Sequence, residues 1–263
     1  MSLGEHHGSW LEWLYTTHLL PEWVPAVIPH SFVVILILVV LSILASRNIQ
    51  KVPGGIQNFM EWVVEGLENF TVASIGEDGR RFTPLIGTFF LYIACQNLIG
   101  LIPGMLSPTS SLNTTVALGL TAIVFVHYYA LKEIGFKAWA THFMGEPRWL
   151  FPLMVPLHIV GEVARPLSLS LRLFGNIFGE ETVLVILAGM SPILLQIAGV
   201  PLIALPVQLP MMIFGCFTAL LQALVFSMLL CIYITVTIGE HHTHADGHME
   251  HDEHDILASA VPI

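Results

Sequence analysis

The chain has 263 residues, of which 55% are hydrophobic and only 11% are charged, whereas soluble domains usually carry about 25% charged residues. This composition excludes an ordinary soluble protein and indicates an integral membrane protein. The net charge of −10 comes mainly from the two ends of the chain, which excludes a basic surface for nucleic acid.

The cysteine pattern and the N-terminus exclude two further classes. Cys95, Cys216 and Cys231 lie in apolar runs without a CxxC pair, so neither a disulfide framework nor a metal site is indicated. The N-terminus lacks a basic region followed by a short apolar stretch and a small-residue cleavage site, so we expect no removable signal peptide.

The first apolar segment follows a region that contains no Lys or Arg. Residues 1–23 include glutamates, tryptophans and a tyrosine, and such aromatic residues are typical of the headgroup level of a membrane. From Val24 to Ser46 no residue is charged, and this length crosses about 30 Å of hydrocarbon. We therefore expect an external segment over 1–23 and a single transmembrane helical domain over 24–239.

Residues 56–72 have a different pattern. Apolar residues recur there with helical spacing, whereas Glu61, Glu65 and Glu68 line another face. The pattern predicts an amphipathic helix on the cytoplasmic side that does not span the membrane. It is compatible with a position in the interface plane or against a partner protein, and the sequence favours neither.

The remaining apolar runs predict four further membrane helices. The uncharged run from Phe82 to Leu131 is broken by IPGMLSPTSSLN, which predicts helices at about 84–103 and 113–131. Two long helices are expected at about 153–188 and 205–238, and both exceed a perpendicular span, so we expect tilting or kinks. The expected fold is all-α, with about five membrane helices and one interfacial amphipathic helix.

The basic residues predict the orientation. Seven of the nine Lys and Arg residues lie in the loops after the first and third predicted membrane helices: Arg47, Lys51, Arg80, Arg81, Lys132, Lys137 and Arg148. By the positive-inside rule these loops are cytoplasmic and the N-terminus is outside, which places the C-terminus in the cytoplasm. Residues 240–263 are rich in His, Asp and Glu. Such a tract can bind metal, but its irregular spacing and the lack of an apolar framework favour a solvated, disordered tail.

Arg172 lies within the apolar stretch 166–181, PLSLSLRLFGNIFGEE. A guanidinium keeps its proton wherever it lies, and placing it at mid-bilayer depth costs roughly 3 to over 10 kcal/mol. The expected reason for such a charge is an ion pathway, a counter-ion or a charged partner.

A polar stripe surrounds this arginine. Three polar residues lie within about 40° of Arg172 on a helical wheel: Arg165, Ser168 and Asn176. Glu162 and Glu180 lie about 80° away, and Glu181 points to the opposite side. Buried carboxyl groups can exchange protons near neutral pH and the arginine cannot, so a proton path along this stripe would be interrupted at Arg172.

Structural roles are the alternatives for these residues. Arg172 could snorkel, or pair statically with Glu180 or Glu162; we favour the functional role, because the nearest helix end is distant and Arg165 can pair with Glu162. Gln222 is equally compatible with a hydrogen bond between helices and with a role as partner of Arg172. Hydrogen bonds between helices are also expected for three polar residues: Asn97, His127 and His158.

Three segments resemble subunit a of the F-type ATP synthase. LSLSLRLFGNIFGEE resembles the signature around the essential arginine of that family. TPLIGTFFLYIACQNLIGLIPG with SPTSSLNTTVALGL resembles its central hairpin, and LQALVFSMLLCIYI resembles its last helix. The resemblance covers roughly residues 50–240.

The resemblance implies roles for individual residues. It places the essential arginine at Arg172, the nearby asparagine at Asn176 and the last-helix glutamine at Gln222. It places the carboxylate of the periplasm-facing half-channel at Glu181. A basic residue before proline and a small hydroxyl residue are also matched, by Arg165 and Ser168 respectively.

Two departures from the family pattern concern the outer half of the pathway. Ser111 stands where some members have an acidic residue, so the outer access route is expected to differ. Gly215 stands where some members have His or Glu, and Glu180 stands where those members often have a small residue. We therefore infer that Glu180 supplies the carboxyl group that position 215 lacks.

The resemblance implies a subunit of a bacterial plasma (inner) membrane complex that carries H⁺, with Na⁺ as the alternative, through two half-channels. The implied partners are a ring of c subunits, peripheral-stalk b subunits and the lipid bilayer, with no cofactor. The chain has no GxxxxGK[ST] loop, so ATP chemistry is expected elsewhere in the complex. The rival interpretation is a self-contained secondary transporter, which often has internal repeats that we do not find here. A structural membrane anchor is disfavoured by the cost of Arg172.

Overall fold

The computed structural model describes seven parts of the chain: residues 21, 24–47, 49–50, 54–102, 104–144, 151–198 and 209–259. These parts contain helices and no strands, which confirms the predicted all-α class. The predicted external segment 1–23 lies almost entirely outside the described residues.

The helices follow one another along the chain as α2 (Val27–Ser46), α3 (Gly55–Ile75), the 3₁₀ turn η1 (Glu77–Phe82), α4 (Thr83–Ile99), the 3₁₀ turn η2 (Pro108–Ser110), α5 (Leu112–Met144), α6 (Phe151–Ala198) and α7 (Leu209–Ser259).

Four segments of the described chain are long and apolar enough to cross a membrane: Val27–Ser46, Glu77–Ile99, Leu112–Phe136 and Leu209–Thr237. Helix α6, which carries five charged residues, is not among these four segments of the described chain. It is nevertheless 48 residues long and packs against α5 and α7. The described chain therefore has four candidate membrane spans, together with the long helix α6 and the amphipathic helix α3.

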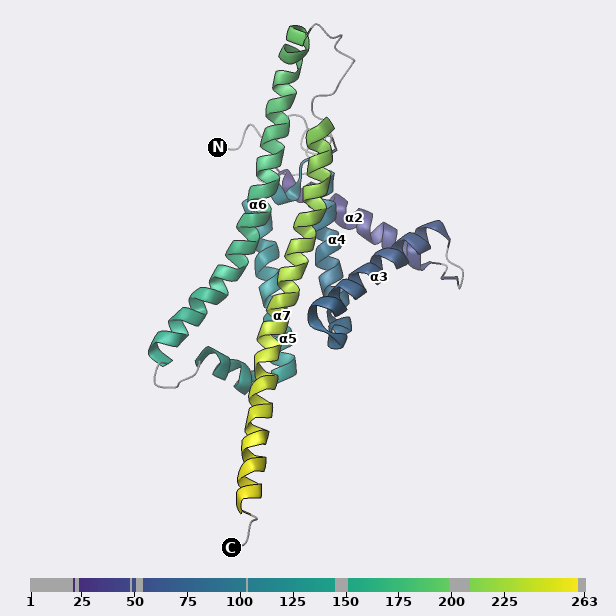
Figure 1. The fold of residues 1–263 in the computed structure, drawn as a ribbon. Helices are drawn as coiled ribbons and strands as arrows, with labels where there is room; N and C mark the ends of the chain where they lie inside the picture. Colours follow the sequence, from purple (N-terminus) through teal and green to yellow (C-terminus); the bar gives the residue numbers. More distant parts are fainter. Residues whose placement is uncertain are drawn as a thin grey trace.

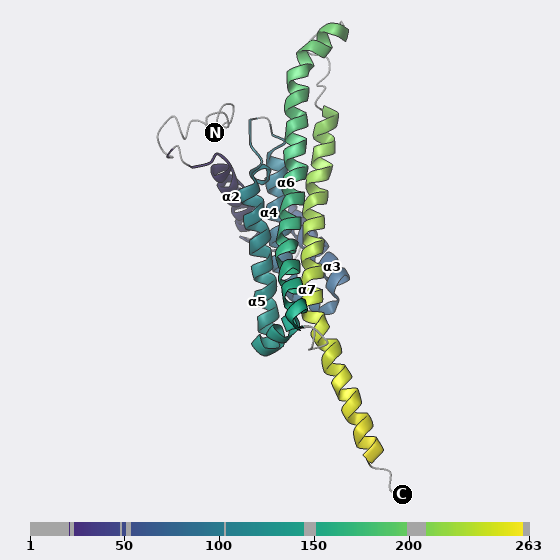
Figure 2. The ribbon, with the colours of Figure 1, turned by 90° about the vertical axis from the view of Figure 1, so that its left-hand side faces the viewer.

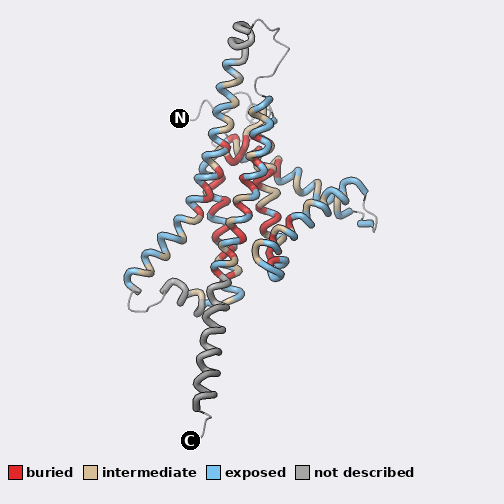
Figure 3. Tube along the Cα trace, viewed as in Figure 1, coloured by how far each residue is buried: buried red, intermediate tan, exposed pale blue. Residues whose placement is uncertain are grey.

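The long helices form a bundle with α2 and α3 at one side. Helices α4, α5, α6 and α7 run alongside one another in both views (Figures 1 and 2). Their contact surfaces bury aliphatic and aromatic side chains, among them Ile93, Leu173 and Phe226. The buried parts of the trace gather where these helices run together (Figure 3). Many outward-facing residues are also large and apolar, for example Leu171 and Phe217, as expected where lipid or another membrane protein covers a surface.

Helix α6 bends in its first half (Figure 1). Pro166 lies within the helix, and its ring nitrogen cannot donate the backbone hydrogen bond to the carbonyl of Glu162. Bending was expected from the length of this helix, and an internal proline is a recognised cause of it.

Helix α5 extends beyond the predicted end at 131. It continues to Met144 through a break at Gly135, where φ is 79° and ψ is 162°. Glycine adopts this backbone conformation without the steric penalty that a Cβ atom would bring. The break turns the last part of α5 away from its main axis (Figure 1).

Helix α7 continues into the segment that the sequence predicted to be a disordered C-terminal tail. Helix α7 begins at Leu209 and continues to Ser259, so most of the segment 240–263 is helical. No proline follows Pro210 until Pro262, so the sequence between them contains no strong helix stop. The side chains that could hold a metal in this tail lie outside the described residues.

The amphipathic segment 56–72 is confirmed as part of helix α3. Leu67 and Thr71 are buried against the bundle, whereas Phe59 and Trp62 are exposed. The helix contacts α2, α4 and α7 and is not among the candidate membrane spans of the described chain.

We predict that α3 lies at the cytoplasmic surface without crossing the membrane. In a variant without native cysteines, Glu61→Cys and Glu65→Cys should react with a membrane-impermeant reagent added to the cytoplasmic side, because both side chains are exposed. Leu67→Cys is the matched control and should stay unlabelled, because Leu67 is only 8% exposed. Labelling of the two glutamate positions from the outside alone would contradict this placement.

Candidate functional site

The predicted polar stripe lies on the surface of α6. Arg172 and Ser168 are exposed one helical turn apart, whereas the neighbouring Leu169 and Leu173 are buried in the bundle. Within the described chain, no acidic side chain lies within ion-pair distance of Arg172. The static bridges to Glu162 or Glu180 that the sequence left open are therefore not formed.

One turn further along α6, Asn176 joins α6 to α7. Its Nδ2 donates a hydrogen bond of 2.8 Å to Oε1 of Gln222, whose residue is only 5% exposed. Asn97 of α4 donates to the carbonyl oxygen of Ala219 at 3.3 Å on the same part of α7. Gln222 is thus the hydrogen-bond partner of Asn176, and it lies close to the turn that carries Arg172.

Glu181 points toward the loop between α4 and α5. The backbone N–H of Ser107 donates to its Oε1 at 3.1 Å. The Ser107 hydroxyl donates to the carbonyl of Gln96 at 2.9 Å, and Thr109 donates to Oδ1 of Asn97 at 2.7 Å. These bonds fasten the loop to α4 and place it against the Glu181 carboxylate.

The loop residues that contact Glu181 were missed by sequence reasoning. From the sequence, Ser111 was identified as a position where this chain departs from the family pattern. The residue that contacts Glu181 is instead Ser107. The available signal was the run SPTSS, whose hydroxyl groups follow a proline and glycine break in an otherwise apolar region.

Glu180 lies against α7. Its Oε2 accepts a hydrogen bond of 2.9 Å from the Thr218 hydroxyl. A Cβ atom built on Gly215 would collide with the Glu180 carboxyl group, so this carboxyl occupies the space that a side chain at 215 would need. The structure thus brings together the two positions that the sequence linked.

Near the cytoplasmic end predicted for α6, Glu162 and Arg165 pair with each other. Nη1 of Arg165 lies 2.5 Å from Oε1 of Glu162, and the guanidinium carbon of Arg165 lies 5.3 Å from the ring centre of Tyr233 on α7. Nε2 of His127 on α5 lies 3.2 Å from Oε2 of Glu162. The predicted Glu162–Arg165 pair is therefore present on α6, and His127 connects it to α5.

The spacing along α6 separates these groups. Glu162 precedes Arg172 by about 15 Å of helix, and Glu181 follows it by about 13 Å, at 1.5 Å per residue. Carboxyl groups can bind and release protons, whereas arginine cannot. The arrangement therefore places carboxyl groups on both sides of the fixed positive charge of Arg172 along α6.

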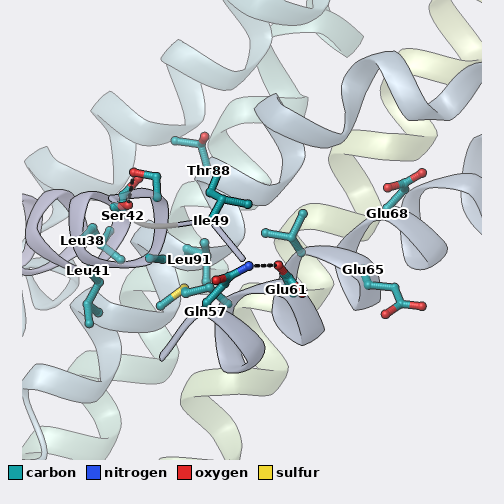
Figure 4. Close-up of a pocket in the computed structure, with 14 residues that line it drawn as sticks. Leu38, Leu41, Ser42, Ile49, Gln57, Glu61, Glu65, Glu68, Thr88 and Leu91 are labelled. Atoms are coloured by element: carbon teal, nitrogen blue, oxygen red, sulfur yellow. Dashed lines mark hydrogen bonds between the residues drawn. The ribbon is translucent and has the colours of Figure 1, made fainter. Parts of the chain in front are cut away.

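Two cavities lie outside the Arg172 region. One of about 680 Å³ lies between α2, α3 and α4, where Glu61, Glu65 and Glu68 accompany apolar residues such as Leu41 and Leu91 (Figure 4). The other, of about 470 Å³, lies between α5 and α6 and is lined by apolar residues together with Glu162 and Ser170. Among the described side chains, no group of three or more His, Cys, Asp or Glu could hold a metal ion.

Comparison with known proteins gives consistent matches. Residues 28–235 match the family model described as ATP synthase A chain. The chain is 43% identical over 213 residues to ATP synthase subunit a of Trichlorobacter lovleyi, covering 81% of this chain and 87% of that protein. It is 41% identical to ATP synthase subunit a of Geotalea uraniireducens and 42% identical to that of Geobacter sulfurreducens, each over 215 residues covering 82% of this chain and 88% of the relative.

Proposed function

We propose, on the premise that this chain belongs to the ATP synthase A chain family, that it conducts protons through two half-channels separated by Arg172. As a member of that family it is an integral membrane subunit of the ATP synthase, and it takes part in proton transport and ATP synthesis. In the proposed mechanism, Arg172 faces a carboxylate on each subunit of a rotating c-ring, and proton flow drives the rotation.

The observation that carries the proposal is the exposure of Arg172 on an apolar helix face without an acidic partner in the described chain. A guanidinium in such a place is costly in a membrane unless another charge approaches it. A carboxylate of the ring would supply that charge. When it approaches Arg172, attraction favours its ionised form and helps it release a proton.

The outer half-channel would use the groups that follow Arg172 on α6. Glu181 is held by the Ser107 loop, and Glu180 lies over Gly215. We assign Glu181 and Glu180 as proton-exchanging groups and the Asn176–Gln222 pair as the polar link toward Arg172. Glu180 then supplies the carboxyl group that α7 lacks at position 215.

The inner half-channel would use the groups that precede Arg172. The side chain of Glu162 is 15% exposed and pairs with Arg165. It is therefore mostly buried but still accessible to water from the cytoplasmic side. Ser168 lies on the exposed surface between Arg165 and Arg172 and provides a hydroxyl group along this path. A proton on the ring would leave through this group of residues.

The surfaces of the chain are compatible with the expected partners. The exposed apolar face of α6 and α7 around Arg172 suits a ring of c subunits. The cavity between α2, α3 and α4 combines an apolar wall with three glutamates, which suits a membrane helix of a peripheral-stalk b subunit with a basic cytoplasmic end (Figure 4). We further propose that the complex lies in a bacterial inner membrane, with the N-terminus outside and the C-terminus in the cytoplasm, and that the transported ion is H⁺, with Na⁺ as the alternative.

A self-contained secondary transporter is the second candidate. Such proteins bind their ion near the bilayer midplane between repeats, where broken helices enclose the site. Arg172 instead lies on an outer helix face, and α6 is continuous around it. The geometry therefore favours a subunit that works against a partner.

Cross-linking within the intact complex tests the proposal. In a variant without native cysteines, Ser168→Cys should form a disulfide with a cysteine placed beside the ring carboxylate, because Ser168 lies one turn from Arg172 on the exposed face. Phe32→Cys is the control: Phe32 is 65% exposed but lies on α2, away from this face, and should not cross-link to the ring.

Co-purification provides the second part of this test. Mild detergent extraction followed by mass spectrometry should recover the chain with a ring of small hydrophobic subunits. Recovery of an active ion transporter that lacks such a ring would support the second candidate and contradict the proposal.

A further inference from the structure

Helix α6 carries two arginines on one side. Arg165 and Arg172 are seven residues apart, which is two helical turns or about 10 Å, and they lie within about 20° of each other around the helix. Both keep their positive charge at every physiological pH. A ring carboxylate that approaches this side of α6 therefore meets two cations that could attract it, whereas the proposed mechanism uses only Arg172.

The guanidinium of Arg165 is held by two contacts, whereas Arg172 is exposed and has no acidic partner in the described chain. Nη1 of Arg165 lies 2.5 Å from Oε1 of Glu162 on the same helix. Its guanidinium carbon lies 5.3 Å from the ring centre of Tyr233 on α7. A cation within about 6 Å of an aromatic ring centre is attracted by the ring quadrupole. The Arg165 side chain is accordingly only 26% exposed.

The packing of α7 fixes the place of Tyr233. Its ring packs against the buried core of the bundle, and its neighbours on α7, Leu230 and Ile234, belong to that core. Tyr233 follows Gln222 by 11 residues, which is about three turns, so both residues lie on the side of α7 that contacts α6. Contacts between α6 and α7 therefore lie on both sides of the turn that carries Arg172.

We propose that Tyr233 is a positioning residue that keeps Arg165 away from the ring carboxylates, so that they pair with Arg172 alone. This inference rests on the proposed function of Arg172. An aromatic ring suits the task because it attracts a cation without carrying a formal charge. A second glutamate in its place would also hold Arg165, but its negative charge would repel the approaching ring carboxylate.

Replacement of the ring should release Arg165. Tyr233→Leu removes one of the two contacts that hold the guanidinium. The long arginine side chain can then extend over the exposed surface of α6 toward Ser168, where a ring carboxylate can pair with it. A cation–π contact shifts such an equilibrium by roughly 2- to 30-fold. We therefore expect ring carboxylates to spend at least about threefold more time on the Arg165 side of Arg172.

Disulfide cross-linking in the intact complex measures where the ring carboxylates lie. In a parent without native cysteines, Ser168→Cys and Gly179→Cys are introduced separately, each with a cysteine beside the ring carboxylate. Ser168 lies between the two arginines, and Gly179 lies two turns beyond Arg172 on the same side of α6. Both positions are exposed, and a Cβ atom on Gly179 meets nothing within 4 Å. The ratio of the Ser168 yield to the Gly179 yield should rise at least about threefold in Tyr233→Leu.

Three further variants separate this role from simple packing. Tyr233→Phe keeps the ring, so the yield ratio should stay near that of the parent. In the Arg165→Gln background, Tyr233→Leu should leave the ratio unchanged, because no second cation remains to be released. Tyr129→Leu is the matched control. Tyr129 also packs against the core, where its ring meets that of Phe82 edge to face with centres 5.2 Å apart, and its replacement should not change the ratio.

The proposal is overturned if an assembled Tyr233→Leu complex keeps the parental ratio, if Tyr233→Phe or Tyr129→Leu raises the ratio equally, or if the rise persists with Arg165→Gln. Tyr233→Met is the second variant at the site and should resemble Tyr233→Leu. Failure of both to assemble would assign Tyr233 a purely structural role and would also overturn the proposal. The proposed function fails differently, because neither Ser168→Cys nor Gly179→Cys would then cross-link to the ring in the parent.

Discussion

Arg172→Ala is expected to reduce ATP-driven proton pumping by about 10²-fold or more. Removing a fixed charge or a hydrogen-bond donor from a site that excludes water typically causes a loss of this size. The side chain is exposed on the apolar face of α6 and has no acidic partner in the described chain. Its loss therefore breaks no observed ion pair within this subunit. What is lost is the attraction for the ring carboxylate and the fixed charge between the two half-channels.

The same variant should show a second, separable effect. Passive proton leak under an imposed membrane potential should rise, because no permanent cation separates the groups near Glu181 from those near Glu162. Arg172→Lys should also function poorly. Lysine is charged in water but can lose its proton where it is desolvated, and it lacks the planar, delocalised guanidinium.

Both effects are measured in membrane vesicles after assembly of the complex has been verified. Arg80→Ala is the matched control: Arg80 is 67% exposed by side chain and pairs with Glu68 at 3.3 Å, far from the α6–α7 face. Surface pairs of this kind contribute little to stability, so pumping should stay near the wild-type rate. An assembled Arg172→Ala complex that pumps at more than a small fraction of that rate would show that the proposed mechanism is wrong.

The helices of the fold were predictable where the sequence of the helix itself shows a characteristic pattern. Uncharged runs predicted the membrane helices, and the three glutamates beside an apolar stripe predicted α3. The helix ends were less predictable. Helix α5 passes through Gly135 with a change of direction, and α7 continues into a polar tail, because neither place has the proline that would stop a helix.

The relative positions of site residues on α6 were predictable from the sequence, whereas contacts between residues of different helices were much less so. A helical wheel predicted that Ser168 and Arg172 lie on one face of α6, and both are exposed there. The contact of Ser107 with Glu181 joins residues 74 positions apart, and the contact of His127 with Glu162 joins α5 to α6. Such contacts depend on how helices pack and on where a loop is fastened, and helical periodicity carries no information about either.

The link between Glu180 and Gly215 leads to the second prediction of large effect. Gly215→Ala is expected to reduce proton pumping by at least about tenfold, a modest loss for a displaced proton-transfer group. A Cβ atom at 215 would meet the Glu180 carboxyl group and would lie 2.9 Å from Cδ2 of Leu101. The carboxyl group would have to leave its position beside Thr218. Glu180→Ala should cause a similar loss, because it removes the carboxyl group itself.

The double variant Glu180→Gly with Gly215→Glu decides between a proton-exchanging role and simple packing. It moves the carboxyl group from α6 to α7 while keeping the same space between the helices filled. If this location needs a carboxyl group, whichever helix provides it, the double variant should pump faster than either single variant. Gly66→Ala on α3 is the control, since a Cβ atom there meets nothing within 4 Å and pumping should be unchanged. Normal pumping by Gly215→Ala, or a double variant that assembles but pumps no faster than Glu180→Ala, would remove Glu180 from the proposed outer half-channel and leave Glu181 as its carboxylate.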